Sequence, residues 1–575
     1  MAGVVPTQLS GIPVLVLKEG STRSRGKEAQ RANITAAKIV AETIKSAFGP
    51  KGMDKMLVDS LGDITITSDG ATILDEMDIQ HPAAKIMVET AKTTDDEVGD
   101  GTTSVVILAG ELLIKAEALL DNKIHPTIIV DGYKKAAAKS LELYDEIAIN
   151  ISATDQEALK KIAMTAMASK IVREYRGHLA DLAVDAVLKI AEKENGEYKI
   201  DIDDIEQLKK DGESLTGTKL IEGMILEKEV VHPGMPKRID NAKVALIDSA
   251  LEVEKPEFDT KIHIESPAMM KVFMDKEEQM MKEMANKIVN AGANVAICQK
   301  GIDEVVQHFL ARNGVLAIRR AKQSSMEKLA KATGGRVVTS LDDLTEESLG
   351  RAGLVEERRV GDDKWVFVEQ CKNPKAVTIL VRGGTEKIVD EAERSIHDAL
   401  SVVRDAVLRP KIVAGGGAPE MDIASRLKEW AEQLSGREQL AALGFAEALE
   451  VIPKTLAENA GLDPIDILVE LRSRHEKGEK WTGVDVFSGK VTDMSELDVY
   501  EPLAVKEQII KSASESSCMI LRIDDMIASA KTKMPPMPPG GPGGGMPPGG
   551  MPGMPMYLIF PFFSTLSRHG LCESQ

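Results

Sequence analysis

Cysteine, aromatic side chains and long apolar runs are all scarce in this chain of 575 residues. The four cysteines include no Cys-x-x-Cys pair, which argues against a disulfide scaffold and against a thiolate zinc site. No run reaches the ~18 apolar residues that a membrane-spanning helix needs. The apolar stretch 12–17 is too short for the core of a signal peptide. We therefore expect a cytoplasmic protein without a membrane partner.

Positive charge is also in short supply, since 72 Lys and Arg residues face 91 Asp and Glu residues, a formal net charge of −19. A general nucleic-acid binder needs basic surface, so nucleic acid is not an expected partner. Nucleotide binding stays open because it is a local event. The sequence also lacks GxxxxGK[ST], HExxH and GxSxG, and its nine histidines show no metal-ligand spacing. His81, His125 and His232 each precede a proline, which favours a role in turns.

The first 150 residues read as mainly helical with one hairpin. Apolar residues at 3/4/3/4 spacing over 34–48 predict an amphipathic helix that ends at Gly49 and Pro50. Residues 55–58 and 63–67 alternate as two strands, and another helix runs from Thr102.

The middle of the chain has a different pattern. Between about 224 and 370, short apolar runs at 244–247, 295–298, 316–318 and 337–338 alternate with helical segments, which indicates an α/β domain. From about Lys375 the chain is again rich in helix, ending with a helix near 512–530. The sequence therefore predicts a multi-domain protein in which an α/β domain is inserted into a mostly helical one.

The C-terminal end is compositionally distinct. Residues 534–556 contain only Met, Pro and Gly, so we expect a flexible tail. Residues 557–575 change character abruptly, as a sequencing frameshift or an expression scar would, and we leave them out of the fold.

One glycine turn carries chemistry. Gly99-Asp100-Gly101-Thr102-Thr103-Ser104 lies directly before a helix, whose first N–H groups and positive dipole end suit a phosphate. Asp100 would repel phosphate unless Mg²⁺ lay between them. The alternative is an ordinary turn with a threonine N-cap, and on this turn alone the two are equally good.

Three further turns of this kind occur in the two helical halves, at 48–52, 67–72 and 413–418. Each one alone is more often structural. Four of them in an interrupted helical domain suggest one phosphate pocket built from both halves.

In order and spacing, the segments 48–52, 68–72, 99–104 and 413–417 resemble the nucleotide-site motifs of the chaperonins. The resemblance covers residues 9–530 and is strongest to the group II chaperonins, the archaeal thermosome subunits and their eukaryotic cytosolic relatives. It implies an equatorial ATPase domain (1–150 and 402–533), an intermediate domain (151–222 and 369–401) and an apical substrate-binding domain (223–368).

The resemblance also implies site residues. It assigns Mg²⁺ binding to Asp100, water activation to Asp398, a place near the γ-phosphate to Asp69, and nucleotide sensing to Lys170. The residues that it places around the nucleotide are Gly49, Pro50, Gly101, Thr102, Thr103, Ser104, Gly416, Gly483, Asp485 and Glu501. Without it, Asp398 reads as the partner of Arg394 in a surface i,i+4 pair.

The implied function is an ATP-dependent chaperone that uses ATP and Mg²⁺, with K⁺ as a candidate additional ion. Its partners would be unfolded proteins and other subunits of a double ring, without a separate lid protein. One alternative is a chaperonin-like scaffold or filament subunit with incidental ATPase activity. A phosphotransferase is disfavoured because no dedicated small-molecule site is evident beside Asp100.

Two apical surfaces could bind unfolded proteins. Residues 252–287 match the helical protrusion that serves as a built-in lid, and they carry six methionines, which suit varied partners or fill gaps between helices. The stripe Ile302, Val305, Val306, Phe309 and Leu310 is more often core than a binding surface.

Overall fold

The computed structural model describes residues 7–9, 12–14, 22–168, 171–253, 267–372 and 374–528. It contains two compact units, of which the larger is Arg23–Ile527. In the smaller unit, β1 (Thr7–Leu9) and β2 (Ile12–Val14) pair as an antiparallel hairpin. Within the described ranges, no helix is long and apolar enough to cross a membrane. The predicted tails at 534–556 and 557–575 lie outside the described residues.

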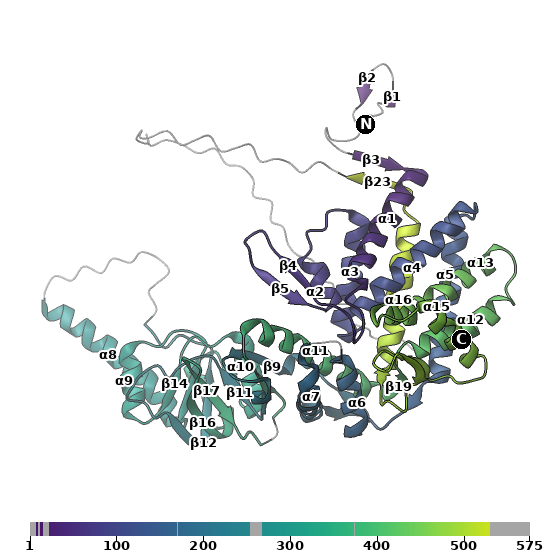
Figure 1. Ribbon diagram of the computed structural model, residues 1–575. Helices are drawn as coiled ribbons and strands as arrows, with labels where there is room; N and C mark the ends of the chain where they lie inside the picture. The colour runs from purple at the N-terminus through teal and green to yellow at the C-terminus, as the bar shows by residue number, and fades with distance from the viewer. Residues whose placement is uncertain are drawn as a thin grey trace, which may run out of the picture. The chain divides into compact units, whose positions relative to one another are not determined.

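Helices from both ends of the chain pack together in the larger unit (Figure 1). They are α1 (Gly26–Lys45), α2 (Gly70–Glu76), α3 (Pro82–Val98), α4 (Thr102–Asp121), α5 (Pro126–Ile147) and α16 (Leu503–Leu521). The central helix is α4, which contacts α1, α3, α5 and α16. Because partners surround it, its buried residues are apolar on several faces, as Val105, Ile107 and Leu113 show.

The histidines that precede prolines have a defined role. The ring Nδ1 of His81 accepts a hydrogen bond from the Ala83 N–H at 3.2 Å at the start of α3, and His125 caps α5 in the same way. Proline at the first helical position has no N–H to satisfy, so the pair makes an efficient helix start. These two histidines are thus helix N-caps and not turn residues, whereas His232, which accepts from the Gly234 N–H at 3.0 Å, lies in a turn as predicted.

The C-terminal helices form a second layer against α5 and α4. They are α12 (Ala418–Ala431), α13 (Arg437–Leu449), α14 (Val451–Asn459) and α15 (Pro464–His475), followed by the hairpin of β20 (Thr482–Asp485) and β21 (Lys490–Asp493). Tyr133 of α5 meets Phe445 of α13 edge to face, with ring centroids 5.6 Å apart, inside the same apolar core.

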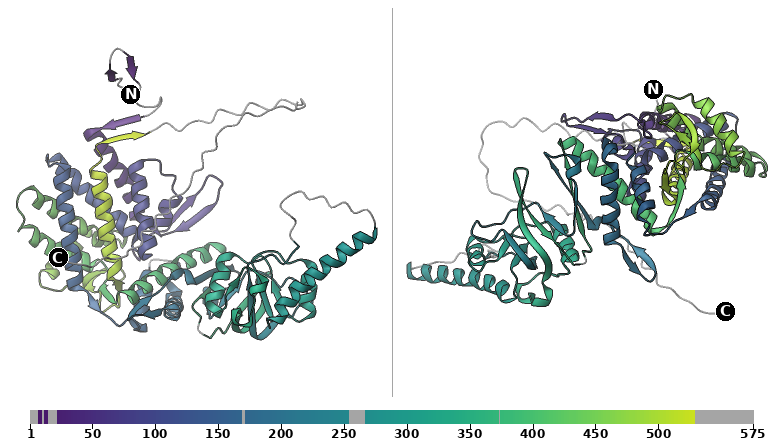
Figure 2. Two further views of the ribbon diagram at one scale, coloured as in Figure 1. Left: turned by 180° about the vertical axis from the view of Figure 1, so that it is seen from behind. Right: turned by 60° about the horizontal axis from the view of Figure 1, so that its bottom comes forward.

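The α/β part is built on one mixed seven-stranded sheet (Figure 2). The strands follow the order β11 (Met224–Leu226), β17 (Asp363–Glu369), β16 (Gly350–Val360), β12 (Arg238–Ile247), β13 (Val295–Cys298) and β14 (Leu316–Ile318), and β15 (Val337–Val338) also pairs with β12. Helices α8 (Pro267–Asn290), α9 (Glu304–Arg312) and α10 (Gln323–Thr333) complete it. Two apolar clusters lie within this part, which therefore has its own core, and a third joins β11, β16 and β17 to Leu208 and Leu380.

A smaller group of elements connects these parts in sequence. It contains β6 (Ile149–Asn150), α6 (Gln156–Ala166), η1 (Ile171–Tyr175), α7 (Arg176–Ile190), the hairpin of β7 (Glu192–Glu194) and β8 (Glu197–Lys199), and a three-stranded sheet of β10 (Lys219–Ile221), β18 (Val377–Gly383) and β9 (Ile205–Asp211). From it, α11 (Glu386–Leu408) runs without a break to β19 (Lys411–Ala414), which pairs with β6 and β22 (Tyr500–Pro502).

Most local predictions agree with these elements. The four apolar runs of the α/β part are strands, and the early hairpin is β4 (Lys55–Val58) and β5 (Ile64–Thr67). Helix α1 ends at Lys45, four residues before the predicted end at Gly49. The helix predicted near 512–530 is wrong in its second half, since α16 ends at Leu521 and β23 (Asp525–Ala528) pairs with β3 (Thr22–Arg25).

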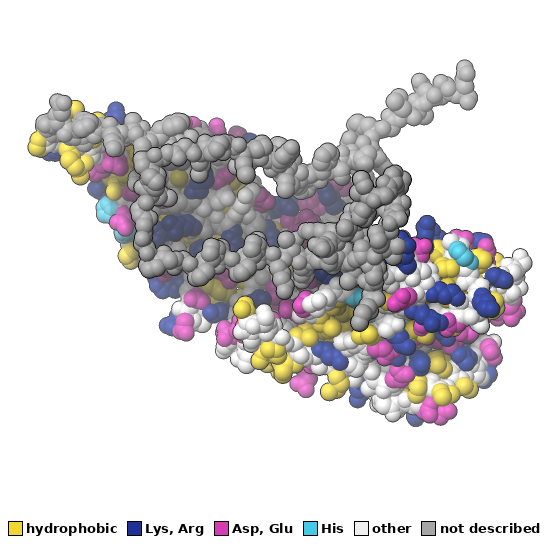
Figure 3. Space-filling model, turned by 90° about the horizontal axis from the view of Figure 1, so that it is seen from above, with side chains coloured by type: hydrophobic (Ala, Val, Ile, Leu, Met, Phe, Trp, Pro, Cys, Tyr) yellow, Lys and Arg dark blue, Asp and Glu magenta, His cyan; other side chains and the backbone are white. Residues whose placement is uncertain are grey.

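The two candidate binding surfaces of the α/β part have different outcomes. Val306 and Leu310 of α9 are fully buried and Ile302 nearly so, which confirms that the stripe is core. In α8 the first half is exposed, with hydrophobic side chains gathered at its end (Figure 3). From Met281 onward the helix joins the core of the α/β part. Elsewhere on the described part of this face, acidic and basic side chains are interspersed.

The contact between α1 and α4 gives a stability prediction. A Cβ on Gly110 of α4 would lie 2.4 Å from Cβ of Ala41, so Gly110→Ala must push the helices apart. We expect the free energy of unfolding to fall by about 1–3 kcal/mol. The matched control is Gly177→Ala in α7, where a Cβ meets nothing within 4 Å. Its free energy should stay unchanged or rise by up to ~1 kcal/mol through helix propensity. Denaturant unfolding of each purified variant measures both values, and equal midpoints would contradict this packing.

Candidate functional site

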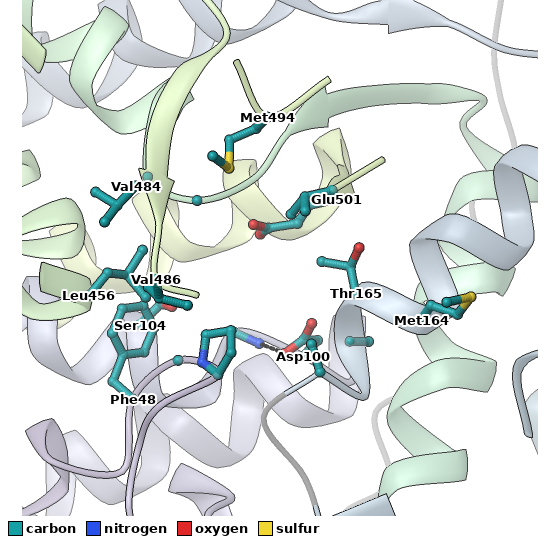
Figure 4. A pocket seen from close by; sticks show the side chains of 18 of the residues that line it. Phe48, Asp100, Ser104, Met164, Thr165, Leu456, Val484, Val486, Met494 and Glu501 are labelled. Atoms are coloured by element: carbon teal, nitrogen blue, oxygen red, sulfur yellow. Dashed lines mark hydrogen bonds between the residues drawn. The ribbon is translucent and has the colours of Figure 1, made fainter. Parts of the chain in front are cut away.

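A cavity of about 830 Å³ lies where the glycine turns of the two helical halves meet. Its wall includes residues from all four turns that the sequence singled out, as represented by Gly49, Asp69, Asp100 and Gly416. Figure 4 shows the carboxyl groups of Asp100 and Glu501 pointing into the same open space. Segments more than 300 residues apart therefore share one site.

The floor of the cavity is the first turn of α4. Gly99 and Gly101 adopt left-handed backbone angles, with φ of 64° and 79°. A Cβ on Gly99 would lie 2.2 Å from Cβ of Ser401 in α11, and one on Gly101 would lie 2.8 Å from Cδ1 of Ile509 in α16. No other residue type fits between these helices in this conformation. The N–H groups at the start of α4 consequently face the cavity with their positive dipole end.

Asp69 joins the second acidic turn to this helix start. Its Oδ2 caps α2 by accepting from the N–H and the hydroxyl of Thr72, both at 2.8 Å. Its Oδ1 accepts from the Thr102 hydroxyl at 2.9 Å, across 33 positions of sequence. Two helix N-termini and two carboxylates, Asp69 and Asp100, thus meet at the polar end of the cavity.

The opposite side of the cavity is apolar. Leu456, Val484 and Val486 lie together there with Phe48, and Met494 lies beside them (Figure 4). These side chains come from α14, the β20–β21 region and the turn after α1. An apolar wall facing a polar helix start suits a ligand with a flat apolar end and an anionic end.

Asp398 enters the site from α11. It is 8% exposed and lines both the main cavity and a neighbouring one of about 170 Å³, which Asp69 also lines. The interpretation of Asp398 as a solvated surface residue is therefore wrong, because the residue is buried. The Arg394 guanidinium donates to Glu391 at 2.9 Å. Burial lowers the pKa of the adjacent His397.

The remaining predicted residues are placed as follows. The cavity wall includes Pro50, Thr102, Thr103, Ser104, Asp485 and Glu501. Gly483 does not line it but lies directly behind, since a Cβ there would be 2.8 Å from the Gly416 carbonyl oxygen. Lys170 lies outside the described residues. The carboxylate of Asp485 accepts the Phe487 N–H at 2.9 Å and so shapes the β20–β21 turn.

Sequence reasoning missed the apolar wall and Lys506, which also lines the cavity. The wall residues sit in four separate segments, and of them only Phe48 belongs to one of the glycine turns. Lys506 follows Glu501 by five residues, a spacing that predicts no contact, and the two side chains meet because the chain passes directly from β22 into α16.

A metal cage made only of protein groups is not found, since the described residues contain no group of three or more His, Cys, Asp or Glu with that geometry. Asp100 beside a helix N-terminus is a different kind of donor. Mg²⁺ commonly binds through one or two carboxylates and the phosphate oxygens of a nucleotide, and this chain supplies that carboxylate.

Comparisons with known proteins agree with this geometry. The model of the TCP-1/cpn60 chaperonin family matches residues 40–531. The chain is 58% identical over 552 residues to thermosome subunit beta of Archaeoglobus fulgidus, covering 96% of this chain and 99% of that one. It is 58% identical over 524 residues to a thermosome subunit of Pyrococcus horikoshii, covering 91% and 95%.

The solved structures include a similar one, the open-state monomer of a group II chaperonin from Methanococcoides burtonii. It has 46% sequence identity and a TM-score of 0.57, with 74% of this chain and 100% of that chain covered. The predicted fold class, a mostly helical part with an inserted α/β part, is confirmed by both kinds of match. The chain therefore belongs to the TCP-1/cpn60 chaperonin family, as a group II chaperonin subunit.

Proposed function

We propose that this chaperonin subunit is an ATPase that couples ATP hydrolysis to protein folding inside a cytoplasmic double ring. The observation that carries the nucleotide assignment is the cavity at the start of α4, whose volume and two-sided wall suit an adenine nucleotide. The base would lie against Leu456 and Val484, and the phosphates at the N–H groups of Thr102 and Thr103. Glu501 would face the ribose hydroxyls.

Phosphoryl transfer to water needs charge neutralisation and an aligned nucleophile more than covalent chemistry from the protein. Asp100 would hold Mg²⁺, which neutralises phosphate charge when bound. The α4 dipole stabilises the same charge. Asp398 and Asp69 line the same cavity, and they would accept a proton from the water and orient it. Lys170 would act as the sensor of the γ-phosphate, and K⁺ is a candidate second cation.

The domain plan follows from the same resemblance. Residues 1–150 and 402–533 would be the equatorial domain, 151–222 and 369–401 the intermediate domain, and 223–368 the apical domain. Since α11 spans both sides of the boundary at 401, closure of the intermediate domain would move Asp398 relative to α4. The protrusion at 252–287 would close the chamber over an unfolded client, without a separate lid protein.

The first test concerns Asp398. Asp398→Asn should still bind ATP, but its turnover should fall by roughly 10²–10⁴, because a general base contributes that much. The matched control is Asp405→Asn, a buried aspartate on the same helix that lines neither cavity. Nucleotide binding, ATP turnover and ATP-dependent refolding of a denatured client are measured on assembled rings.

The refolding arm separates a chaperone from a scaffold with incidental hydrolysis. Wild-type rings should refold the client only with ATP, and Asp398→Asn should slow refolding together with turnover. If wild-type rings refold the client equally well with and without ATP, the result would favour the scaffold. Turnover near wild type in Asp398→Asn would remove this carboxylate from the reaction.

Asp100 should act at the binding step. Asp100→Asn should weaken nucleotide binding in the presence of Mg²⁺ by about tenfold or more, which corresponds to ~1.4 kcal/mol. Binding without Mg²⁺ should not weaken and should tighten if anything, because the Asp100 carboxylate then only repels the phosphates. Calorimetric titration with and without Mg²⁺ measures both, and Asp96→Asn on the exposed side of α3 is the control. An unchanged Mg²⁺ dependence would place the ion elsewhere.

The lid prediction can be tested by a deletion that spares the core. Removing residues 254–277 takes away the exposed half of α8 and keeps Met281, Ala285 and Ile288, which are buried. Ring mass and ATP turnover should stay at wild-type values, because the nucleotide cavity lies on other elements. A bound client should lose its protection from protease after ATP addition. Wild-type rings digested in parallel are the reference, and full protection in the deleted rings would refute the lid.

A further inference from the structure

A buried ion cluster lies at the polar end of the cavity. Nζ of Lys506 is 2.6 Å from Oε2 of Glu501 and 2.7 Å from Oε1 of Glu420. The three residues come from different elements, since Lys506 is on α16, Glu420 is in the first turn of α12, and Glu501 is in β22. One cation therefore bridges two carboxylates from separate segments.

Solvent contributes little to this cluster. Lys506 is 4% exposed and Glu420 5% exposed, so the charges must be balanced within the protein. Burial raises the pKa of Glu501, and Lys506 acts against that shift. The pKa of Lys506 is itself raised: burial alone would lower it, but the two carboxylates outweigh burial. Lys506 is consequently a permanent cation, and it is the group that favours the ionised form of Glu501.

The position of the Glu501 carboxylate is fixed on its other side too. The backbone of Glu501 pairs with Val413 in the β19–β22 ladder, immediately before the glycine turn at 415–417. Its Oε1 lies 2.7 Å from the place where a Cβ on Gly415 would be. The carboxylate therefore packs directly against the backbone of this glycine. One oxygen is held by Lys506, and the carboxyl group faces the cavity (Figure 4).

We propose that Lys506, anchored by Glu420, is a positioning residue that holds Glu501 oriented and ionised to accept hydrogen bonds from the ribose hydroxyls of the nucleotide. This inference rests on the proposed nucleotide function. It makes the cluster the device that selects ribonucleotides over deoxyribonucleotides. A carboxylate that accepts from a hydroxyl gives a stronger bond than a neutral acceptor, and a deoxy ligand leaves that acceptor unpaired.

A positioning role and a purely structural role for Lys506 predict different binding results. A structural role would change stability and would weaken ATP and 2′-deoxy-ATP binding to the same degree. A positioning role changes the ratio of the two dissociation constants. The wild type should bind ATP about tenfold or more tightly than 2′-deoxy-ATP or 3′-deoxy-ATP, whichever hydroxyl Glu501 contacts.

The experiment measures the dissociation constants of ATP, 2′-deoxy-ATP and 3′-deoxy-ATP on assembled full-length rings by calorimetry. Lys506→Met and Glu501→Gln should each bring the preference down to about two-fold or less. The double variant should lose nothing further, because both changes act on one contact. Lys506→Arg, which keeps the charge, should recover part of the preference.

The matched control is Lys511→Met. Lys511 lies on the same helix, pairs with Glu507 at 3.4 Å and does not line the cavity, so its preference should equal that of the wild type. If Lys506→Met does not fold, the double variant Glu420→Gln/Lys506→Gln replaces it, because this variant removes one buried charge of each sign. The same dissociation constants are then measured on the double variant.

The outcomes are distinct. A wild-type preference retained in Lys506→Met, or in the paired variant, overturns the role of Lys506. A wild type that binds none of the three nucleotides overturns the proposed function instead. Loss of preference in Lys511→Met would show that the effect comes from the helix and not from the cluster.

Discussion

The turn before α4 is closely packed at Gly99 and Gly101, where no side chain fits, and the geometry of the cavity depends on this constraint. Ser401 of α11 packs against Gly99, and Ile509 of α16 packs against Gly101. Arg404 of α11 also donates to the carbonyl oxygen of Glu97 at 2.5 Å, at the end of α3. Three helices thus hold one turn, and the first N–H groups of α4 point in a fixed direction.

This constraint explains why the site could be found in the sequence only in part. The glycine turns are visible because bare backbone needs glycine, and their order gave the resemblance to chaperonins. The strands of the α/β part were also predictable, since each is a short apolar run such as 295–298. Both kinds of feature are local, so residues next to one another in sequence carry the information.

The features that the sequence did not reveal depend on long-range contacts. The segment 525–528 looked helical and is a strand, because Arg23 and Arg25 lie beside Asp525 and β3 supplies the pairing. The environment of Lys506 depends on its ion pair with Glu420, which lies 86 positions earlier in the sequence. The apolar wall is assembled from four segments, and Asp398 looked like a surface residue until the packing of α11 buried it.

The charges of the cavity impose a condition on any anionic ligand. Asp69, Asp100, Asp398 and Glu501 all line it, and the protein as a whole has an excess of acidic residues. A triphosphate that entered alone would meet these carboxylates at close range, where repulsion is strong. The α4 dipole and the cations that also line the cavity, Lys160, Lys161, Arg176 and Lys506, offset part of this charge. Lys160 and Lys161 pair with Asp181 and Asp498, and Lys506 is engaged with two carboxylates. The remaining imbalance is what a divalent cation on Asp100 would neutralise.

Since α11 is one stiff helix from Glu386 to Leu408, displacement of its first turns would also move Asp398 relative to these charges. In the proposed mechanism, the distance between Asp398 and the cation on Asp100 would set when the water can be activated, so a movement of α11 would control chemistry at α4.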